Sequence, residues 1–463
     1  MRADLQGPQS LRILAISAEV PSAVGSGGSV RAWHCLRAVA RRHDVLLYLL
    51  AAGVPDGLDG QLDLVGSAAA TNRQSSTRPG YTRFLKSLLL PWMHQGRALI
   101  QAGHNICSER AEGRLTVLHW LYGWWLVLQL CVLRRHFLLD PPDLHLRSGT
   151  MLPLEQTAAI QAFAADALWI EHSYLYPLAE RVCRRFSIQR ILVNAHNVEH
   201  QLKELSAAAA PTLLSRCWQR QVSAICRQYE TRMLRTAELI ACCSHDDLQR
   251  FQVLLPGNAA RARLVVVPNG VDTRHFQPGC AAAEADSLIF TGTAGYGPND
   301  DAVAWLLREL LPAIREQIPS IRLILAGRNA GHFWGDLAAG TSGVEIHSDV
   351  ADMRVLLSRA RAAIVPVRQG SGTRFKILEA MSMGLPVIST SLGAEGLDVV
   401  HGRELLLANS KEQITAAIRL IWGNAELSRQ MAIAARAAAC DRYDWLRIEL
   451  GLELALSGMH RSG

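Results

Sequence analysis

The feature that most constrains the fold is the alternation of short apolar runs with longer helical patterns along most of the 463-residue chain. Apolar runs of about four to eight residues are typical of strands buried on both faces, and their alternation with helices is the pattern of parallel sheets with crossover helices. The expected strands are 11–17, 44–50, 167–171, 191–195, 239–243 and 264–267, and then 288–291, 321–326, 344–347, 362–367 and 386–390. The sequence therefore predicts an α/β fold with two Rossmann-like, doubly wound sheets.

A turn-rich stretch, PNGVDTRHFQPGCAAAEAD, separates the two sets of strands and predicts a hinge. We expect a first domain over residues 1–275, elaborated at about 67–153, and a second domain over residues 286–440. Residues 441–463 should form a C-terminal helix that packs back on the first domain. Two facing domains of this kind bind ligands in the cleft between them, outside the carboxyl ends of their strands.

Charge and composition limit the partners. The chain has 48 basic and 41 acidic residues, a net charge of +7, without a Lys/Arg run dense enough to bind nucleic acid. Its ten cysteines form no C-x-x-C pair, so neither a metal nor a redox cofactor is predicted. The polar start lacks the pattern of a signal peptide, which predicts a cytoplasmic protein.

One segment, residues 115–133, has no charged residue and is just long enough to cross a bilayer. Its tryptophans, Trp120, Trp124 and Trp125, favour a membrane interface over hydrocarbon. A peripheral membrane contact, a buried helix and a true span all stay open for this segment.

The strongest candidate site is the stretch RQGSGTRFKILEAM, which follows a predicted strand and leads into a helix. A glycine-rich turn at a helix N-terminus directs backbone N–H groups and the positive end of the helix dipole at an anion. Two cations in the first turn fit a bound diphosphate, and a carboxylate further along could bind a ribose diol. The candidate residues are Gly370, Ser371, Gly372, Thr373, Arg374, Lys376 and Glu379. An ordinary strand–turn–helix with a solvated polar face is the alternative.

Weaker signals lie in the first domain. Gly27 and Gly28, between the first strand and the first helix, would let a ligand approach the backbone closely, or they form only a turn. His196 follows the strand ILVNA and would face the cleft, although a lone histidine is more often structural. His172, after the preceding strand, has a similar position, whereas Asn269 and Gly270 are typical of a hinge turn.

Taken together and in order, these motifs resemble the retaining glycosyltransferases of family 4, which have the GT-B fold. The matching stretches are the SGG loop, VNAHNVE, YETRMLRTAELIACCSHDD, VVVPNGVDTRHFQP, FTGTAGYGPNDDAVAWLL and GSGTRFKILEAMSMGLPVIST followed by GAEGL. The resemblance covers most of the chain outside residues 67–153 and is nearest to the branch that works in exopolysaccharide and cell-envelope assembly.

The resemblance implies a nucleotide-diphosphate sugar as donor, bound mainly by the second domain without a metal or other cofactor. It implies that Glu379 binds the donor ribose, that His196 lies near the anomeric carbon, and that the backbone around Val350 contacts the base. Gly27 and Gly28 match the loop that approaches the donor phosphate and the acceptor.

The sequence departs from the family pattern at three positions. Ser371 stands where the family's E-x7-E motif has its first glutamate, and Thr293 and Asn299 stand where many relatives carry an arginine and a lysine for the diphosphate. Arg374 and Lys376 are the residues expected to neutralise the diphosphate instead.

The function expected from the resemblance is transfer of a sugar to a glycan or lipid-linked acceptor in exopolysaccharide or cell-envelope polysaccharide biosynthesis. Such an enzyme would work in the cytoplasm, or at the inner face of the cytoplasmic membrane if residues 115–133 contact it. A catalytically weak scaffold subunit and a sugar-nucleotide epimerase of the same fold are the alternatives.

Overall fold

The computed structural model describes residues 10–50, 63–67, 154–210, 212–255, 260–279, 284, 286–370 and 375–457. The segment 115–133 lies outside the described residues, as do Ser371, Gly372, Thr373 and Arg374. Among the described residues, no helix combines the length and the hydropathy that crossing a membrane requires.

The first sheet has seven strands within the described residues, in the order β3-β2-β1-β4-β5-β6-β7. Every neighbouring pair in it is parallel. The strands are β1 (Arg12–Ser17), β2 (Asp44–Leu49), β3 (Asp63–Ser67), β4 (Ala167–Glu171), β5 (Arg190–Ala195), β6 (Leu239–Cys242) and β7 (Arg263–Val266). The order reverses between β1 and β4, which is where doubly wound sheets bind ligands.

The second sheet, again within the described residues, has six parallel strands in the order β10-β9-β8-β11-β12-β13. They are β8 (Ser287–Thr291), β9 (Arg322–Gly327), β10 (Val344–Ser348), β11 (Ala362–Val365), β12 (Val387–Ser389) and β13 (Leu406–Leu407). The predicted doubly wound architecture is therefore confirmed. The strands that sequence reasoning missed, β3 and β13, are short and lie at sheet edges, where an apolar run is not required.

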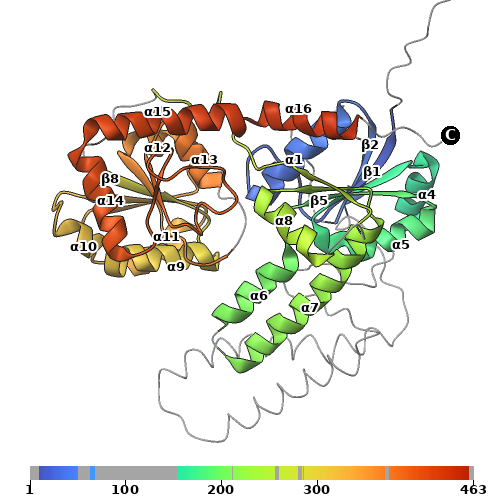
Figure 1. The fold of residues 1–463 in the computed structure, drawn as a ribbon, viewed down its shortest axis with the longest axis horizontal. Helices are drawn as coiled ribbons and strands as arrows, with labels where there is room; N and C mark the ends of the chain where they lie inside the picture. The colour runs from blue at the N-terminus through green and yellow to red at the C-terminus, as the bar shows by residue number, and fades with distance from the viewer. Residues whose placement is uncertain are drawn as a thin grey trace, which may run out of the picture.

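Helices cover both sheets (Figure 1). In the first half they are α1 (Gly27–Ala40), α4 (Leu154–Phe163), η2 (Ser173–Leu175), α5 (Tyr176–Phe186), α6 (Glu199–Ala209), α7 (Leu213–Thr236) and α8 (His245–Leu254). In the second half they are α9 (Gly297–Trp305), η3 (Leu306–Leu310), α10 (Leu311–Arg315), α11 (Ala330–Ala338), α12 (Met353–Arg359), α13 (Phe375–Ser382), α14 (Lys411–Gly423), α15 (Ala425–Arg442) and α16 (Trp445–Leu456). Helices α6 and α7 pack together as a hairpin that extends away from the first sheet (Figure 1).

The chain crosses between the two lobes twice. Helix α15 lies on the second lobe, and α16 continues past it to cover the first, where it packs against α1 (Figure 1). Glu449 of α16 is 1% exposed at its side chain and pairs with His34 and Arg37 of α1, at 2.5 Å each. Trp445 stacks on His34, with ring centroids 4.1 Å apart. These contacts anchor the C-terminal helix to the first domain.

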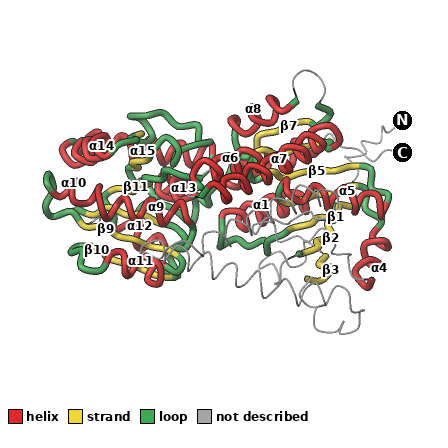
Figure 2. The backbone as a smooth tube through the Cα atoms, turned by 90° about the horizontal axis from the view of Figure 1, so that it is seen from below, coloured by secondary structure: helices red, strands yellow, loops and turns green. Residues whose placement is uncertain are grey.

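The first crossing lies against the second. Val271 and Asp444 form a parallel bridge, and a Cβ added at Gly270 would lie 2.7 Å from side-chain atoms of Trp445 and Ile448. Glycine is required at this position because the two connections touch. The tube view shows the two sheets as separate lobes (Figure 2).

Candidate functional site

Two helix N-termini, one from each domain, meet between the lobes. Helix α1 begins at Gly27 and α13 begins at Phe375. A Cβ added at Gly27 would lie 2.6 Å from Cε2 of Phe375, so the aromatic ring rests directly on the glycine backbone. Because the N-terminus of a helix carries a partial positive charge, the start of α13 is a favourable place for an anion.

On the side of the second domain, Lys376 lies in the first turn of α13. Its Nζ donates to Oδ1 of Asn299 at 2.9 Å and lies 4.0 Å from the centre of the Phe290 ring. Asn299, in turn, donates from Nδ2 to the carbonyl of Thr293 at 2.8 Å. The amide therefore holds the ammonium group at the carboxyl end of β8, even though Asn299 itself brings no charge.

The same edge of the second sheet is shaped by close contact of two backbones. Gly327, at the end of β9, has a φ of +150°, and a Cβ there would lie 1.9 Å from the carbonyl oxygen of Gly292. Only glycine allows this approach. Val350 follows β10 beside this edge, where its side chain is partly buried against the core of the domain.

Glu379 lies one turn after Lys376 on α13 and is partly buried. Burial raises the pKa of its carboxyl to about 7, and the neighbouring charge of Lys376 opposes the rise. Its carboxylate makes no hydrogen bond to any described residue, so both oxygens are available to a ligand. When it is ionised, the Glu379 carboxylate can accept hydrogen bonds from two hydroxyl groups of one sugar ring.

On the side of the first domain, a buried carboxylate organises the ends of β4 and β5. Glu171 is fully buried and accepts from Nε1 of Trp169 at 2.6 Å, Nδ2 of Asn194 at 2.8 Å and Nε2 of His196 at 2.9 Å. Burial raises the pKa of Glu171, and the hydrogen bond from Trp169 is the largest opposing effect. The hydrogen bond between Nε2 and Glu171 therefore fixes the orientation of the His196 ring.

A buried arginine completes this network. Arg31 of α1 is 1% exposed and donates from Nε to Oδ1 of Asn194 at 2.9 Å, and from Nη1 to the carbonyl of Val267 at 2.7 Å and to Oδ1 of Asn269 at 3.1 Å. Asn194 therefore bridges Arg31 to Glu171. The positive charge of the buried Arg31 guanidinium therefore compensates the negative charge of the buried Glu171 carboxylate.

His172 follows β4 and lies against His196, with ring centroids 3.7 Å apart. Burial lowers the pKa of both imidazoles well below the ordinary value, and the neighbouring His196 adds to the effect at His172. Both rings are therefore neutral at pH 7.

The structure places Gly27, Lys376 and Glu379 around the junction of α1 and α13, with His196 at the carboxyl end of β5. Gly370, with a φ of +91°, ends the described part of the glycine-rich turn. The remaining predicted residues of that turn, Ser371, Gly372, Thr373 and Arg374, lie outside the described residues.

Sequence reasoning missed Glu171, Asn194, Arg31 and the role of Asn299. The available signal was position: Glu171 ends one strand and Asn194 is the last residue but one of the next, so parallel pairing brings them to one edge. Asn269, interpreted from sequence as part of a hinge turn, also anchors Arg31.

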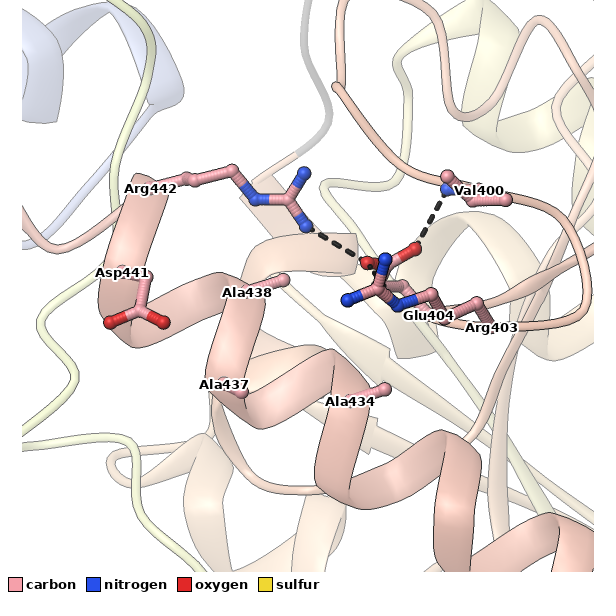
Figure 3. A pocket seen from close by; sticks show the side chains of 8 residues that line it. All are labelled: Val400, Arg403, Glu404, Ala434, Ala437, Ala438, Asp441 and Arg442. Carbon is pink, nitrogen blue, oxygen red and sulfur yellow. Dashed lines mark hydrogen bonds and ion pairs between the residues drawn. The ribbon is translucent and has the colours of Figure 1, made fainter.

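A separate pocket of about 300 Å³ lies in the second domain between α15 and the residues before β13 (Figure 3). Its floor is formed by Ala434, Ala437 and Ala438, and Arg442 reaches across it to Glu404, at 3.0 Å. None of the predicted site residues lines it. Within the described residues there is also no cluster of three or more metal-binding side chains.

Comparisons with known proteins concern the second domain and the fold. Residues 285–424 match the family model described as "Glycosyl transferases group 1". Over the whole chain, the structure is similar to Anabaena HepE in complex with UDP and glucose, with a TM-score of 0.59 and 13% identity, covering 97% of this chain and 100% of that one. The chain has the GT-B fold.

Two curated relatives match parts of the chain. An uncharacterized 44.6 kDa protein in the cps region of Klebsiella pneumoniae is 24% identical over 165 residues, 34% of this chain and 42% of that protein. Glycogen synthase of Mycobacterium tuberculosis is 26% identical over 242 residues, 49% of this chain and 54% of that protein. The chain thus spans about half the length of the curated relatives it matches.

Proposed function

We propose that this GT-B protein is a retaining, metal-independent glycosyltransferase of family 4. It transfers a sugar from a nucleotide-diphosphate sugar to a glycan or lipid-linked acceptor in the biosynthesis of an exopolysaccharide or a cell-envelope polysaccharide. The observation that carries the proposal is the start of α13, where the helix N-terminus and the ammonium of Lys376 lie at the topological switch of the second sheet, between β8 and β11.

The chemistry follows from the charges that develop. Breaking a glycosyl–phosphate bond places negative charge on the departing diphosphate and positive charge on the sugar ring. Lys376, held by Asn299, and the N-terminus of α13 stabilise the diphosphate. Arg374, two residues earlier in the sequence, supplies a second cation. Glu379 accepts the ribose hydroxyls.

His196 serves the sugar side of the reaction. Its Nε2 is hydrogen-bonded to Glu171, so the ring is oriented and its other edge contacts the donor sugar near the anomeric carbon. Attack by the acceptor on the same face, with the leaving phosphate oxygen taking the acceptor proton, preserves the anomeric configuration. Closure of the two lobes excludes water from this step.

Two relatives support the choice of donor and pathway. The UDP and glucose bound to Anabaena HepE support a nucleotide sugar donor here, and the cps-region protein of Klebsiella pneumoniae supports a role in polysaccharide synthesis. We place the protein in the cytoplasm, with peripheral contact to the inner face of the membrane through residues 115–133.

The proposal is tested by incubating the purified protein with UDP-, GDP-, ADP- and dTDP-sugars and a panel of glycan and lipid-linked acceptors, with and without a metal chelator. Product formation with retained anomeric configuration, unaffected by the chelator and strongly reduced in Lys376→Ala and Arg374→Ala, is expected. Lys411→Ala, on the exposed start of α14, is the matched control. Nucleotide binding without turnover would favour the scaffold alternative, and conversion of the donor alone would favour the epimerase.

A further inference from the structure

One buried histidine beside the site has polar atoms that the protein does not satisfy. The His172 side chain is 8% exposed, and neither Nδ1 nor Nε2 has a hydrogen-bond partner among the described residues. Oε1 of Glu19 lies 3.9 Å from Nε2, which is beyond hydrogen-bond distance. Buried polar groups are nearly always paired, so an unpaired imidazole at the edge of a site calls for a ligand.

The backbone of His172 is held in an unfavourable conformation. Its φ is +77°, a region that non-glycine residues seldom adopt. The amide N–H of His172 donates to the carbonyl of Asn194 at 2.9 Å, and the N–H of Leu175 donates to the His172 carbonyl at 3.2 Å. The fold thus maintains a histidine where glycine would fit without strain, and its side chain makes no hydrogen bond to the described residues.

The surroundings define the kind of group that would pair with this imidazole. Tyr174 stacks on the His172 ring with centroids 4.7 Å apart, and the His196 ring lies against it with centroids 3.7 Å apart. The carboxylate of Glu19, near Nε2 of His172, accepts from the hydroxyl of Ser26 at 2.9 Å and is 42% exposed at its side chain. A neutral imidazole has one donor and one acceptor, and a carboxylate accepts only.

Glu19 also changes what the N-terminus of α1 can bind. Its Oε2 lies 2.9 Å from the position that a Cβ on Gly28 would take, so the carboxylate already lies against the start of the helix. A phosphate here would meet a negative charge, whereas a hydroxyl group can donate to it. The start of α1 therefore favours an uncharged, hydroxyl-bearing ligand, in contrast to the start of α13.

We propose that His172 and Glu19 bind the hydroxyl groups of a sugar, either the transferred sugar of the donor or the sugar of the acceptor. This inference rests on the proposed glycosyltransferase function. A ring hydroxyl donates to Glu19, and the same or an adjacent hydroxyl pairs with the imidazole of His172, whose stacked neighbours fix its orientation. His172 is then a sugar-binding residue distinct from His196.

The test uses two variants. His172→Gly removes the side chain and suits the positive φ, whereas His172→Asn keeps a polar side chain at the same backbone conformation. Calorimetric titration with UDP-glucose and with UDP separates sugar binding from nucleotide binding, and the KM for the acceptor used by the wild type reports on the acceptor sugar. We expect the affinity for UDP to stay unchanged. If His172 binds the donor sugar, the affinity for UDP-glucose should fall tenfold or more; if it binds the acceptor sugar, the KM for the acceptor should rise tenfold. A change of about this size is what the loss of a hydrogen bond to a buried polar group produces.

His43 offers the matched control. It too is a buried histidine with an unpaired Nε2 among the described residues, but its Nδ1 accepts from the N–H of Leu11 at 3.2 Å at the opposite end of β1. His43→Asn should lower the melting temperature and leave both sugar readouts unchanged. For His172→Gly we expect the melting temperature to stay near that of the wild type.

Two results would overturn the inference. The first is a folded His172→Gly protein whose affinity for UDP-glucose and whose acceptor KM both match the wild type. The second is a large fall in melting temperature in both His172 variants, which would make the histidine structural. The wild-type protein is measured before any variant. If it forms no product and binds no nucleotide sugar, the proposed function itself is wrong, and this result is distinct from the two above.

Discussion

The two helices that meet between the lobes begin in opposite ways. Helix α1 is capped by Ser26, whose side chain accepts from the N–H of Ser29, and the carboxylate of Glu19 lies against its first turn. Helix α13 has a lysine in its first turn, with Asn299 as the hydrogen-bond partner of the ammonium. The start of α1 thus meets a negative charge and the start of α13 carries a positive one, so only α13 is prepared for a diphosphate.

The residues behind these helix starts differ as well. Behind α1, Arg31, Asn194 and Glu171 form a buried network in which Glu171 alone accepts three hydrogen bonds. Around the start of α13, Lys376 and Glu379 are only partly buried. The comparison indicates that substitutions in the buried network of Arg31, Asn194 and Glu171 lower mainly the stability of the fold. Substitutions on α13 weaken mainly ligand binding. The predictions below test this division.

The largest effect is expected on stability, in the buried network of Arg31, Asn194 and Glu171. Arg31→Met removes a buried guanidinium and leaves the negative charge of Glu171 uncompensated, so the free energy of unfolding should fall by about 3–5 kcal/mol. Urea unfolding measures the change. Adding Glu171→Gln to Arg31→Met should restore part of the loss, and a double variant less stable than the single one would contradict the network.

Next in size is the effect of Lys376→Ala on catalysis. Removing a cation aimed at the leaving group should lower kcat by about 100-fold to 1,000-fold. Unfolding should change by less than about 1 kcal/mol, because the side chain is only partly buried. Steady-state kinetics of Lys376→Ala and of the control Lys411→Ala measure the change in kcat. Equal kcat values in the two variants would contradict a role of Lys376 in catalysis.

A smaller effect is expected where the helix starts touch. Gly27→Ala places a Cβ 2.6 Å from the ring of Phe375, so the start of α13 must shift. Because a misplacement of about 1 Å can reduce catalysis substantially, we expect product formation to fall about tenfold. Shortening the ring in Gly27→Ala/Phe375→Leu should recover activity, and an unimproved double variant would show that the contact does not set the spacing.

The smallest effect concerns the pH dependence of Glu379. Its pKa in the folded protein is raised from 4.5 to about 7, so the folded state binds the proton more tightly than the unfolded state. The stability that this proton contributes is fully present below pH 4.5 and is lost as the pH rises through about 7. At pH 8, Glu379→Gln should therefore be more stable by about 1 kcal/mol, after allowance for partial solvent exposure.

Glu379→Gln should bind nucleotide less well in spite of its greater stability. In the wild type, the affinity for a nucleotide-diphosphate sugar, whose phosphates do not titrate in this range, should rise with pH through about 7, since the ionised carboxylate accepts both ribose hydroxyls. In Glu379→Gln this rise should disappear. Titration calorimetry at pH 6 and pH 8 measures it, and a pH dependence that survives in the variant would assign it to another group.

The sequence predicted the sheets better than the site. Ala167–Glu171 was predicted with both ends correct because an apolar run bounded by polar residues marks a buried strand. The strand Leu406–Leu407 could not be predicted, because two residues carry no periodicity. The packing of Phe375 on Gly27 depends on how the two lobes sit together, and local patterns do not encode that arrangement.

In the site, residues of the glycine-rich turn and the helix after it could be proposed from their spacing, whereas their partners could not. Asn299 was identified only as a missing charge, but in the structure it holds Lys376. Glu171 was not identified, because a glutamate at the end of a strand gives no sign that three donors converge on it. Such contacts join residues far apart in the chain and become visible only once the strands are aligned.

The central claim is that a nucleoside diphosphate binds at the start of α13. Calorimetric titration of the wild type, Lys376→Ala and Lys411→Ala with UDP, GDP, ADP and dTDP tests it most directly. The account predicts that one nucleotide binds the wild type and Lys411→Ala with equal affinity and binds Lys376→Ala at least about tenfold more weakly, about the loss of one charge-assisted hydrogen bond. Equal affinity in all three proteins, or no binding to the wild type, would contradict it.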